Sequence, residues 1–233
     1  MSFAHVITEA VLKYPELKII DSQKVYKEKF ENVPEQVFFK TLSRLEKKGQ
    51  ISRITKGVYC KPKESRFGMV ISGESNILEH LLGKNKNKGV VIGYKMYSRY
   101  GLTTQVSKMV EVYSNVPYQE RKVIRNVAAR KVKLKFEPEI DKLIELLEVL
   151  ENYRSIEELN KTNMFSFFEK SVKDYNDIAL QKILKQIRYK KSTLASLKNV
   201  LDYFNVSHIV SSYLRETSSY SAINMEDLNE VTS

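Results

Sequence analysis

The segment from Asp21 to Pro62 constrains the fold of this chain more than any other stretch of the sequence. It opens with a short apolar-periodic segment, which Ser22 is placed to cap as a helix. A turn is expected at residues 31–33, because Pro34 then stands where the first residue of a new helix belongs. That helix is expected over Glu35–Lys48, where apolar residues recur at steps of three and four.

Gly49 is expected to end this helix, since glycine adopts the left-handed conformation of a C-cap at little cost. A compact hairpin follows, with strands over Gln50–Ile54 and Val58–Lys61 joined by the turn Thr55-Lys56-Gly57. Helix, turn, helix and basic hairpin in this order predict a winged helix-turn-helix. Such a domain places its second helix in the major groove of DNA.

The outward face of the predicted second helix is polar and cationic, as in a DNA-reading surface. Glutamine pairs with adenine, and lysine or arginine pairs with guanine or holds phosphate. The first half of such a helix usually reaches the bases, so Gln36, Lys40 and Ser43 are the expected base readers. The other candidate DNA-binding residues, expected at phosphates and on the wing, are Arg44, Lys47, Arg53, Lys56 and Lys61. The alternative is a protein-binding winged helix whose outward lysines are only solvated.

The charge of the chain is unevenly distributed, which favours a nucleic-acid-binding front. The 233 residues carry a formal net charge of +11. Residues 1–66 contribute +6, residues 67–136 contribute +9 and residues 137–233 contribute −4. A lysine-rich composition alone would explain the total, but it explains this asymmetry poorly.

A second basic segment lies in the middle of the chain and combines seven cations with no acid in 15 residues. A strand is expected over Val132–Phe136, with lysines on one face and apolar side chains on the other. The segment is either an electropositive surface for nucleic acid or an acidic partner, or an ordinary sheet with one solvated face. The candidate residues of this second basic surface are Arg121, Lys122, Arg125, Arg130, Lys131, Lys133 and Lys135.

The whole pattern predicts an α+β fold, mostly α, in three parts. A winged helix-turn-helix over residues 1–66 precedes a second domain over residues 67–215, which combines a mixed α/β middle module with a helical C-terminal section. Residues 216–233, rich in Ser, Thr, Asn and acids, are expected to be a flexible tail. Further helices are expected at Phe3–Tyr14, Glu74–Leu82, Tyr94–Tyr100, from Pro138, and at Ser155–Asn160, Phe165–Val172, Asp177–Tyr189 and Thr193–Phe204.

The sequence contains no catalytic, cofactor or metal motif, so we expect neither an enzyme nor a cofactor nor a metal site. His5, His80 and His208 are scattered and have no partners at ligand spacing. Glycine-rich nucleotide loops and the Gly-Xaa-Ser-Xaa-Gly motif do not occur. Cys60 is the only cysteine, and neither a secretory signal nor an apolar run of membrane-spanning length occurs, so we expect a cytoplasmic protein.

Two stretches of the chain resemble one family. The expected wing, Gly49 to Tyr59, is similar to the N-terminal domain of AbiEi-type antitoxins of type IV toxin–antitoxin systems. Gly93-Tyr94 and the segment Tyr100-Gly101-Leu102-Thr103-Thr104-Gln105-Val106 are similar to the body of that family. There the Leu-Thr-Thr-Gln stretch is typically followed by Val-Pro, whereas here Ser107 follows Val106. The resemblance covers roughly residues 5–200, and Gly101–Val106 is its more distinctive part.

The resemblance implies a bacterial antitoxin with two tasks. The winged helix would bind inverted repeats in the operator DNA of its own promoter and repress the operon. The C-terminal part would counteract a cognate toxin of the nucleotidyltransferase type, without a stable complex. The resemblance implies no catalytic residue. Thr103 and Thr104 also have a purely structural interpretation, because hydroxyl groups satisfy backbone groups in turns.

Two other functions remain open at the level of sequence. A plain winged-helix transcriptional repressor would share the DNA-binding face but would have no toxin to oppose. A nuclease-like defence protein would instead use the middle basic module on nucleic acid. The oligomeric state is also open, because an inverted repeat is filled equally well by a dimer or by two monomers.

Overall fold

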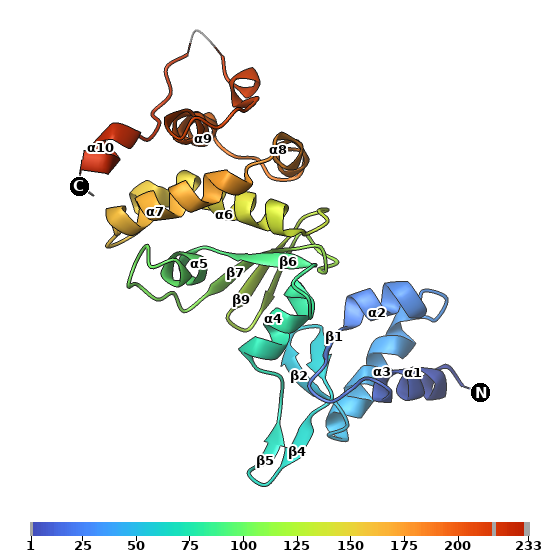
Figure 1. The fold of residues 1–233 in the computed structure, drawn as a ribbon. Coiled ribbons are helices and arrows are strands. Elements are labelled where there is room, and N and C mark those ends of the chain that lie inside the picture. The colour runs from blue at the N-terminus through green and yellow to red at the C-terminus, as the bar shows by residue number, and fades with distance from the viewer. Residues whose placement is uncertain (1, 216–217, 231–233) are drawn as a thin grey trace. The chain divides into compact units, whose positions relative to one another are not determined.

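The chain folds as an α+β protein whose elements cluster into two compact units (Figure 1). The structure, a computed structural model, describes residues 2–215 and 218–230. We call the two clusters the N-terminal unit and the C-terminal unit. None of the helices in these described ranges is long and apolar enough to cross a membrane.

Each unit combines two separate stretches of the chain. The N-terminal unit contains the chain up to Lys86 together with Val116–Lys131. The C-terminal unit contains Asn87–Asn115 and the chain from Val132 onward. The compact units therefore do not divide at residue 66, where the sequence places its first domain boundary. How the proposed functions divide between domains stays a prediction.

The N-terminal unit begins with three helices and a small antiparallel sheet in the predicted order. In the sheet, β3 lies between β1 and β2, with Tyr59 opposite both Ile20 and Arg53. Helix α3 and the β2–β3 hairpin confirm the predicted second helix and hairpin, and the arrangement resembles a winged helix. The elements are α1 (Phe3–Leu12), β1 (Ile19–Asp21), α2 (Ser22–Lys29), α3 (Glu35–Lys47), β2 (Ser52–Thr55) and β3 (Val58–Cys60).

A small apolar core holds these elements together. Ile7 and Val11 of α1 pack in it with Phe38, Leu42 and Leu45 of α3, all almost fully buried. Burial of a side chain of this size stabilises a fold by about 1.5–3 kcal/mol. Because the apolar stripe of α3 faces this core, the polar residues of the helix are left on its outer face.

Aromatic packing fixes the turn between α2 and α3. The hydroxyl of Tyr26 donates to the carbonyl of Val33 across 2.9 Å, and the Tyr26 ring centroid lies 5.3 Å from that of Phe38. Phe39 is half-buried, and its ring packs edge-on against Phe38. Pro34 is the N-cap of α3, one position before the first helical residue.

The N-terminal unit also contains two hairpins and a helix. β4 and β5 pair as an antiparallel hairpin in a stretch where the sequence predicts only a linker. β8 and β9 form the second hairpin, and α4 packs against β9 and β1. These elements are β4 (Lys63–Ser65), β5 (Gly68–Val70), α4 (Glu74–Leu82), β8 (Arg121–Ile124) and β9 (Val127–Lys131).

The C-terminal unit is mainly helical. β6 and β7 pair antiparallel, with Val91 opposite Val112. Its strands are β6 (Gly89–Ile92) and β7 (Val110–Ser114), and its α-helices are α5 (Tyr94–Arg99), α6 (Pro138–Asn152), α7 (Lys161–Ser171), α8 (Asp177–Leu184), α9 (Lys191–Tyr203) and α10 (Met225–Glu230). Short 3₁₀ turns lie at Tyr153–Ser155, Val172–Asp174 and Val210–Tyr213.

Helix α6 is the centre of the C-terminal core. It packs against α7, α8, α9 and β6 (Figure 1). Every residue from Leu143 to Leu150 is buried, including the carboxylates of Glu145 and Glu148. Buried carboxylates are costly unless they are hydrogen-bonded, so this helix requires polar partners from its neighbours.

Two element predictions for the C-terminal unit are wrong. Val132–Phe136 is not a strand, although its apolar side chains are buried as the alternation predicts. These side chains pack into the core of the unit without a strand ladder alongside them. Residues 155–160 do not form a helix, because the chain leaves the 3₁₀ turn in an extended conformation and Glu158 adopts a positive φ of 51°.

The predicted flexible tail contains an ordered helix. In α10, Met225 and Leu228 are buried in the core of the C-terminal unit. These two apolar residues give the segment enough buried surface to fold, despite its polar composition. Residues 216–217 and 231–233 of the same predicted tail lie outside the described residues.

Candidate nucleic-acid interface

The polar residues predicted to face outward from α3 do lie on its exposed face. They recur at steps of three and four residues, so neighbouring side chains lie about 5–6 Å apart at Cβ. The opposite face carries the buried residues of the helix. The exposed candidates on this outer face are Gln36, Lys40, Ser43, Arg44 and Lys47.

The β2–β3 wing adds cations next to this helix. Arg53 on β2 and Lys56 in the connecting turn are exposed. The turn closes at Gly57, whose φ of +74° lies in the left-handed region that favours glycine. Lys61, the third predicted wing cation, follows β3 and is half-buried, and its carbonyl accepts a hydrogen bond from the Leu17 N–H across 2.8 Å.

Ser22 ties the wing to helix α2. Its N–H and its hydroxyl both donate to the carbonyl of Gly57, across 2.9 and 2.8 Å. The sequence predicts Ser22 as the N-cap of α2, but the cap is Asp21, whose carboxylate accepts from the N–H groups of Gln23 and Lys24. Because the Asp21 carboxylate already accepts from N–H groups of the first helical turn, the Ser22 hydroxyl can bond to the wing instead.

The cations of α3 and the wing lack acidic partners. On α1 and α2, lysines pair with glutamates one turn away, as Lys27 does with Glu31 across 2.9 Å. Their charges are therefore largely compensated within the chain. In contrast, no ion pair among the described residues involves the cations of the proposed interface, which are Lys40, Arg44, Lys47, Arg53, Lys56 and Lys61.

The N-terminal unit carries nearly all of the net charge. It holds 21 Lys and Arg against 11 Asp and Glu, a formal charge of +10. The C-terminal unit holds 18 against 17, a formal charge of +1. A unit with this excess of cations attracts polyanions from a distance and concentrates them at its surface.

The second basic segment is divided between the two units. The chain passes from one unit to the other after Lys131, so Lys133 and Lys135 belong to the C-terminal unit. Lys135 lies 2.5 Å from Glu137 in an ion pair. The other five cations lie on the β8–β9 hairpin, where Arg121 stands directly opposite Arg130.

Lys122, one of the predicted basic-surface residues, forms an ion pair inside the N-terminal unit. Its Nζ lies 3.4 Å from Oδ2 of Asp21, and the two side chains are 10% and 7% exposed. A buried charge needs a partner of opposite sign, so this lysine is committed to the structure. Lys131 is also engaged, since its Nζ donates to the Tyr118 carbonyl across 3.0 Å. Arg121, Arg125 and Arg130 are the exposed cations of the hairpin.

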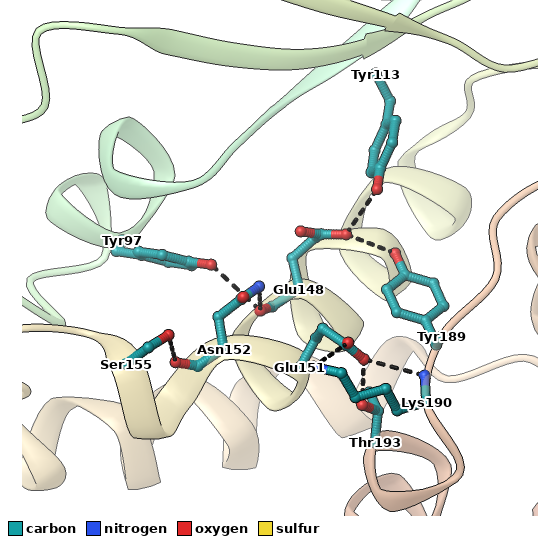
Figure 2. Close-up of polar contacts among 9 residues, drawn as sticks. All are labelled: Tyr97, Tyr113, Glu148, Glu151, Asn152, Ser155, Tyr189, Lys190 and Thr193. Atoms are coloured by element: carbon teal, nitrogen blue, oxygen red, sulfur yellow. Dashed lines mark hydrogen bonds and ion pairs between the residues drawn. The ribbon is translucent and has the colours of Figure 1, made fainter.

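A buried polar cluster of the C-terminal unit surrounds Glu148 (Figure 2). Its carboxylate accepts hydrogen bonds from the hydroxyls of Tyr113 and Tyr189, each across 3.0 Å. The hydroxyl of Tyr97 donates to the Glu148 carbonyl across 3.3 Å. Burial and the nearby Glu148 charge raise the pKa of Tyr97 and of Tyr189 above the usual range. The phenols therefore stay protonated as donors, and the cluster holds a carboxylate in the core.

A second carboxylate of α6, that of Glu151, caps helix α9 (Figure 2). It accepts hydrogen bonds from the Lys190 N–H, across 3.2 Å, and from the Thr193 hydroxyl. The Lys190 Nζ adds an ion pair across 2.9 Å. Burial alone would raise the pKa of Glu151, but these hydrogen bonds lower it below its ordinary value. We therefore interpret both carboxylates as structural.

The segment that carries the family resemblance is hydrogen-bonded to the chain that follows α6. The hydroxyl of Thr103, itself buried, donates to the Glu157 carbonyl across 2.6 Å. The Thr104 hydroxyl donates to the Glu158 carboxylate across 2.7 Å, and this bond lowers the pKa of Glu158. These contacts favour the structural interpretation of the two threonines.

The candidate interface contains no sign of a metal centre. Among the described residues, no group of three or more His, Cys, Asp or Glu side chains is placed to hold a metal ion. His208 lies 2.9 Å from Asp202 in the C-terminal unit.

These observations define an α+β protein whose N-terminal unit resembles a winged helix and presents a cationic helix face. The chain belongs to a family of unknown function, DUF6088, whose model matches residues 25–192. The crystal structure of the Rv2827c protein from Mycobacterium tuberculosis is similar, with a TM-score of 0.42 and 11% sequence identity. That similarity covers 86% of this chain and 76% of the other. No match to a curated protein was found.

Proposed function

We propose that the N-terminal unit is a winged helix-turn-helix that binds duplex DNA through the outer face of α3 and the β2–β3 wing. One observation carries the proposal: the exposed cations of this face have no acidic partner among the described residues, in the unit that holds a formal charge of +10. Each cation that reaches a phosphate releases condensed counterions, which is the main source of affinity for DNA.

Within this proposal the residues of α3 have different roles. Gln36, Lys40 and Ser43 lie in its first two-thirds and reach base edges in the major groove. Arg44 and Lys47 in the last turn contact phosphates and fix the register of the helix. Lys56, at the tip of the wing, contacts the neighbouring backbone. Reading by α3 would supply sequence specificity, and the remaining cations would supply affinity.

We propose further that the chain is an autorepressing antitoxin of a type IV toxin–antitoxin system. The support is the resemblance of the wing and of Gly101–Val106 to AbiEi-type antitoxins. The DNA target is then an inverted repeat in its own promoter, and the C-terminal unit counteracts a nucleotidyltransferase-type toxin without a stable complex. The alternative of a plain repressor uses the same DNA-binding face and differs in having no toxin to oppose.

The first test is repression of a reporter gene placed behind the promoter of the chain's own operon. The full chain represses the reporter, and the variant Lys40→Glu/Arg44→Glu/Lys56→Glu does not, because three phosphate or base contacts become repulsive. Full repression by this variant would contradict DNA binding through the proposed face.

A matched control distinguishes the effect of the α3 face on repression from the effect of the total charge. Lys173, Lys182 and Lys185 are exposed lysines of the C-terminal unit. Their reversal to glutamate changes the net charge by the same amount and should leave repression intact. Equal loss of repression in both triple variants would mean that bulk charge, and not the α3 face, is responsible.

A further inference from the structure

The β4–β5 hairpin exposes more apolar surface than any other two-stranded element of the N-terminal unit. Phe67 is 86% exposed, Met69 is 60% exposed and Val70 is 43% exposed. In Figure 1 the hairpin projects as a free ribbon from the rest of its unit, and its strands contact mainly each other. An isolated two-stranded ribbon is marginal in water, so these side chains are expected to have a partner.

The tip of this hairpin is an ordered turn of defined chemistry. The Ser65 hydroxyl donates to the Gly68 carbonyl across 2.8 Å and accepts from the Phe67 N–H across 3.2 Å. Gly68 closes the turn with a φ of +104°. The guanidinium of Arg66 lies 4.8 Å from the centroid of the Phe67 ring. The tip therefore presents an aromatic ring with a cation beside it.

The base of the hairpin is fixed to the body of the unit at Glu16 and Leu17, and Glu16 forms a β-bridge with Lys61. The Leu17 N–H donates to the Lys61 carbonyl just before β4, and the Leu17 carbonyl accepts from the Ser72 hydroxyl, 2.7 Å away, just after β5. Pro62 and Ser72 are buried at this base. The ribbon is thus anchored to the body of the unit at both ends of its base.

We infer that the β4–β5 hairpin is a minor-groove wedge, an inference that rests on the proposed DNA binding of the same unit. Phenylalanine and methionine are residues that architectural proteins insert between base steps, and an arginine beside them suits the negative potential of a narrow minor groove. A strand rises about 3.3 Å per residue, so Phe67 is carried roughly 13 Å from the base, further than the roughly 7.5 Å depth of that groove.

Charge favours DNA as the occupant over an apolar protein surface. The segment from Lys61 to Val70 contains Lys61, Lys63 and Arg66 against the single acid Glu64. It follows β3 of the proposed wing after two residues, Lys61 and Pro62, so the wedge would extend the same DNA-binding surface. Insertion would kink the duplex by roughly 20–90° and enlarge the contact with the protein.

The experiment measures affinity and bending together. A duplex covering the region upstream of the chain's own coding sequence carries a fluorophore at each end, so that energy transfer reports the bend angle. The wild-type chain binds and bends this duplex. Phe67→Ala reduces the bend and weakens binding about tenfold, the loss expected for one stacked aromatic side chain. Val106→Ala, which truncates an 84% exposed side chain of the C-terminal unit, changes neither.

Wild-type affinity and bend in Phe67→Ala, while Lys40→Glu/Arg44→Glu/Lys56→Glu loses binding, would overturn the wedge and leave the proposed function intact. No binding of the duplex by the wild-type chain would overturn both. Intact bending by Phe67→Ala together with a change in its self-association, measured by sedimentation, would overturn the wedge and assign the hairpin to a second copy of the chain.

Discussion

Gly101 is a conformationally constrained position in the segment Gly101–Val106, which carries the family resemblance. Its φ of +65° lies in the left-handed region, and a Cβ there would stand 2.9 Å from Nδ2 of Asn163. That same Nδ2 donates to the Gly101 carbonyl across 2.7 Å. Asn163 therefore closes over a position that only glycine fills without strain.

Gly101→Ala should destabilise the C-terminal unit by about 1–3 kcal/mol, from the backbone conformation and from displacement of Asn163. Denaturant unfolding of Gly101→Ala alone and in an Asn163→Ala background separates the two causes. The cost should be smaller in that background, because the steric part is gone. An equal cost in both backgrounds would show that the contact with Asn163 contributes nothing.

Asp141, in the first turn of α6, carries a destabilising carboxylate. Its Oδ1 is buried and has no hydrogen-bond partner among the described residues. Burial, and then the negative charge of Glu145, raise the pKa of Asp141 to about 7. The folded state therefore binds a proton that the unfolded state releases near pH 4, so stability is lost as the pH rises from about 4 to about 7.

Asp141→Asn should therefore stabilise the protein at pH 8 more than at pH 5. We expect a difference of about 1–2 kcal/mol, after a reduction for the partial exposure of the side chain. Thermal unfolding at the two pH values measures it. Glu139→Gln, an exposed acid in the same helical turn, is the control. Equal stabilisation at the two pH values would mean that the carboxylate is solvated, with no shift of its pKa on folding.

At the scale of the element, helix α3 should separate specificity from affinity. Gln36→Ala should reduce discrimination between the promoter duplex and an unrelated duplex by about 1–3 kcal/mol, because a base contact is lost. Arg44→Ala should weaken binding to both duplexes alike. Titration of each variant with the two duplexes measures both quantities. Uniform weakening by Gln36→Ala would place this residue at the phosphate backbone.

Helix α3 and the wing were predictable because their signals are local. Pro34 and Gly49 mark the two ends of the helix, and the apolar spacing between them orients its outer face. The β4–β5 hairpin was not predictable, because its strands bury no apolar stripe and resemble a charged linker. The alternation over Val132–Phe136 correctly predicts which side chains are buried. The strand that it also predicts does not form, since a strand needs a hydrogen-bonded neighbour along its length.

Features that depend on distant parts of the chain could not be predicted from local pattern. The basic neighbours of Lys122 suggest a basic surface, and nothing local signals the ion pair that it forms with Asp21, about a hundred residues earlier. The donors to Glu148 likewise come from elements far apart in the sequence. Isolated tyrosines such as Tyr113 on β7 and Tyr189 after α8 give no sequence signal that they will converge on one carboxylate.

At the scale of the whole molecule, the concentration of charge in one unit favours a division of tasks. The full chain and Lys40→Glu/Arg44→Glu/Lys56→Glu should both restore growth to cells that express the product of the adjacent gene, because antitoxicity is assigned to the C-terminal unit. Growth curves measure the rescue. Rescue by the wild-type chain alone would make DNA binding part of neutralisation, and a harmless neighbour would favour the plain repressor.

DNA binding through α3 and the wing is best tested by its dependence on salt concentration. The affinity of the full chain for its promoter duplex is measured across a range of salt concentrations and compared with that of Lys40→Ala/Arg44→Ala/Lys56→Ala. Each lost phosphate contact lowers the magnitude of the slope of log affinity against log salt by about 0.9. Because Arg44 and Lys56 are the two phosphate contacts removed, we expect a slope smaller in magnitude by roughly 2 in the variant. An unchanged slope and affinity would contradict DNA binding through α3 and the wing.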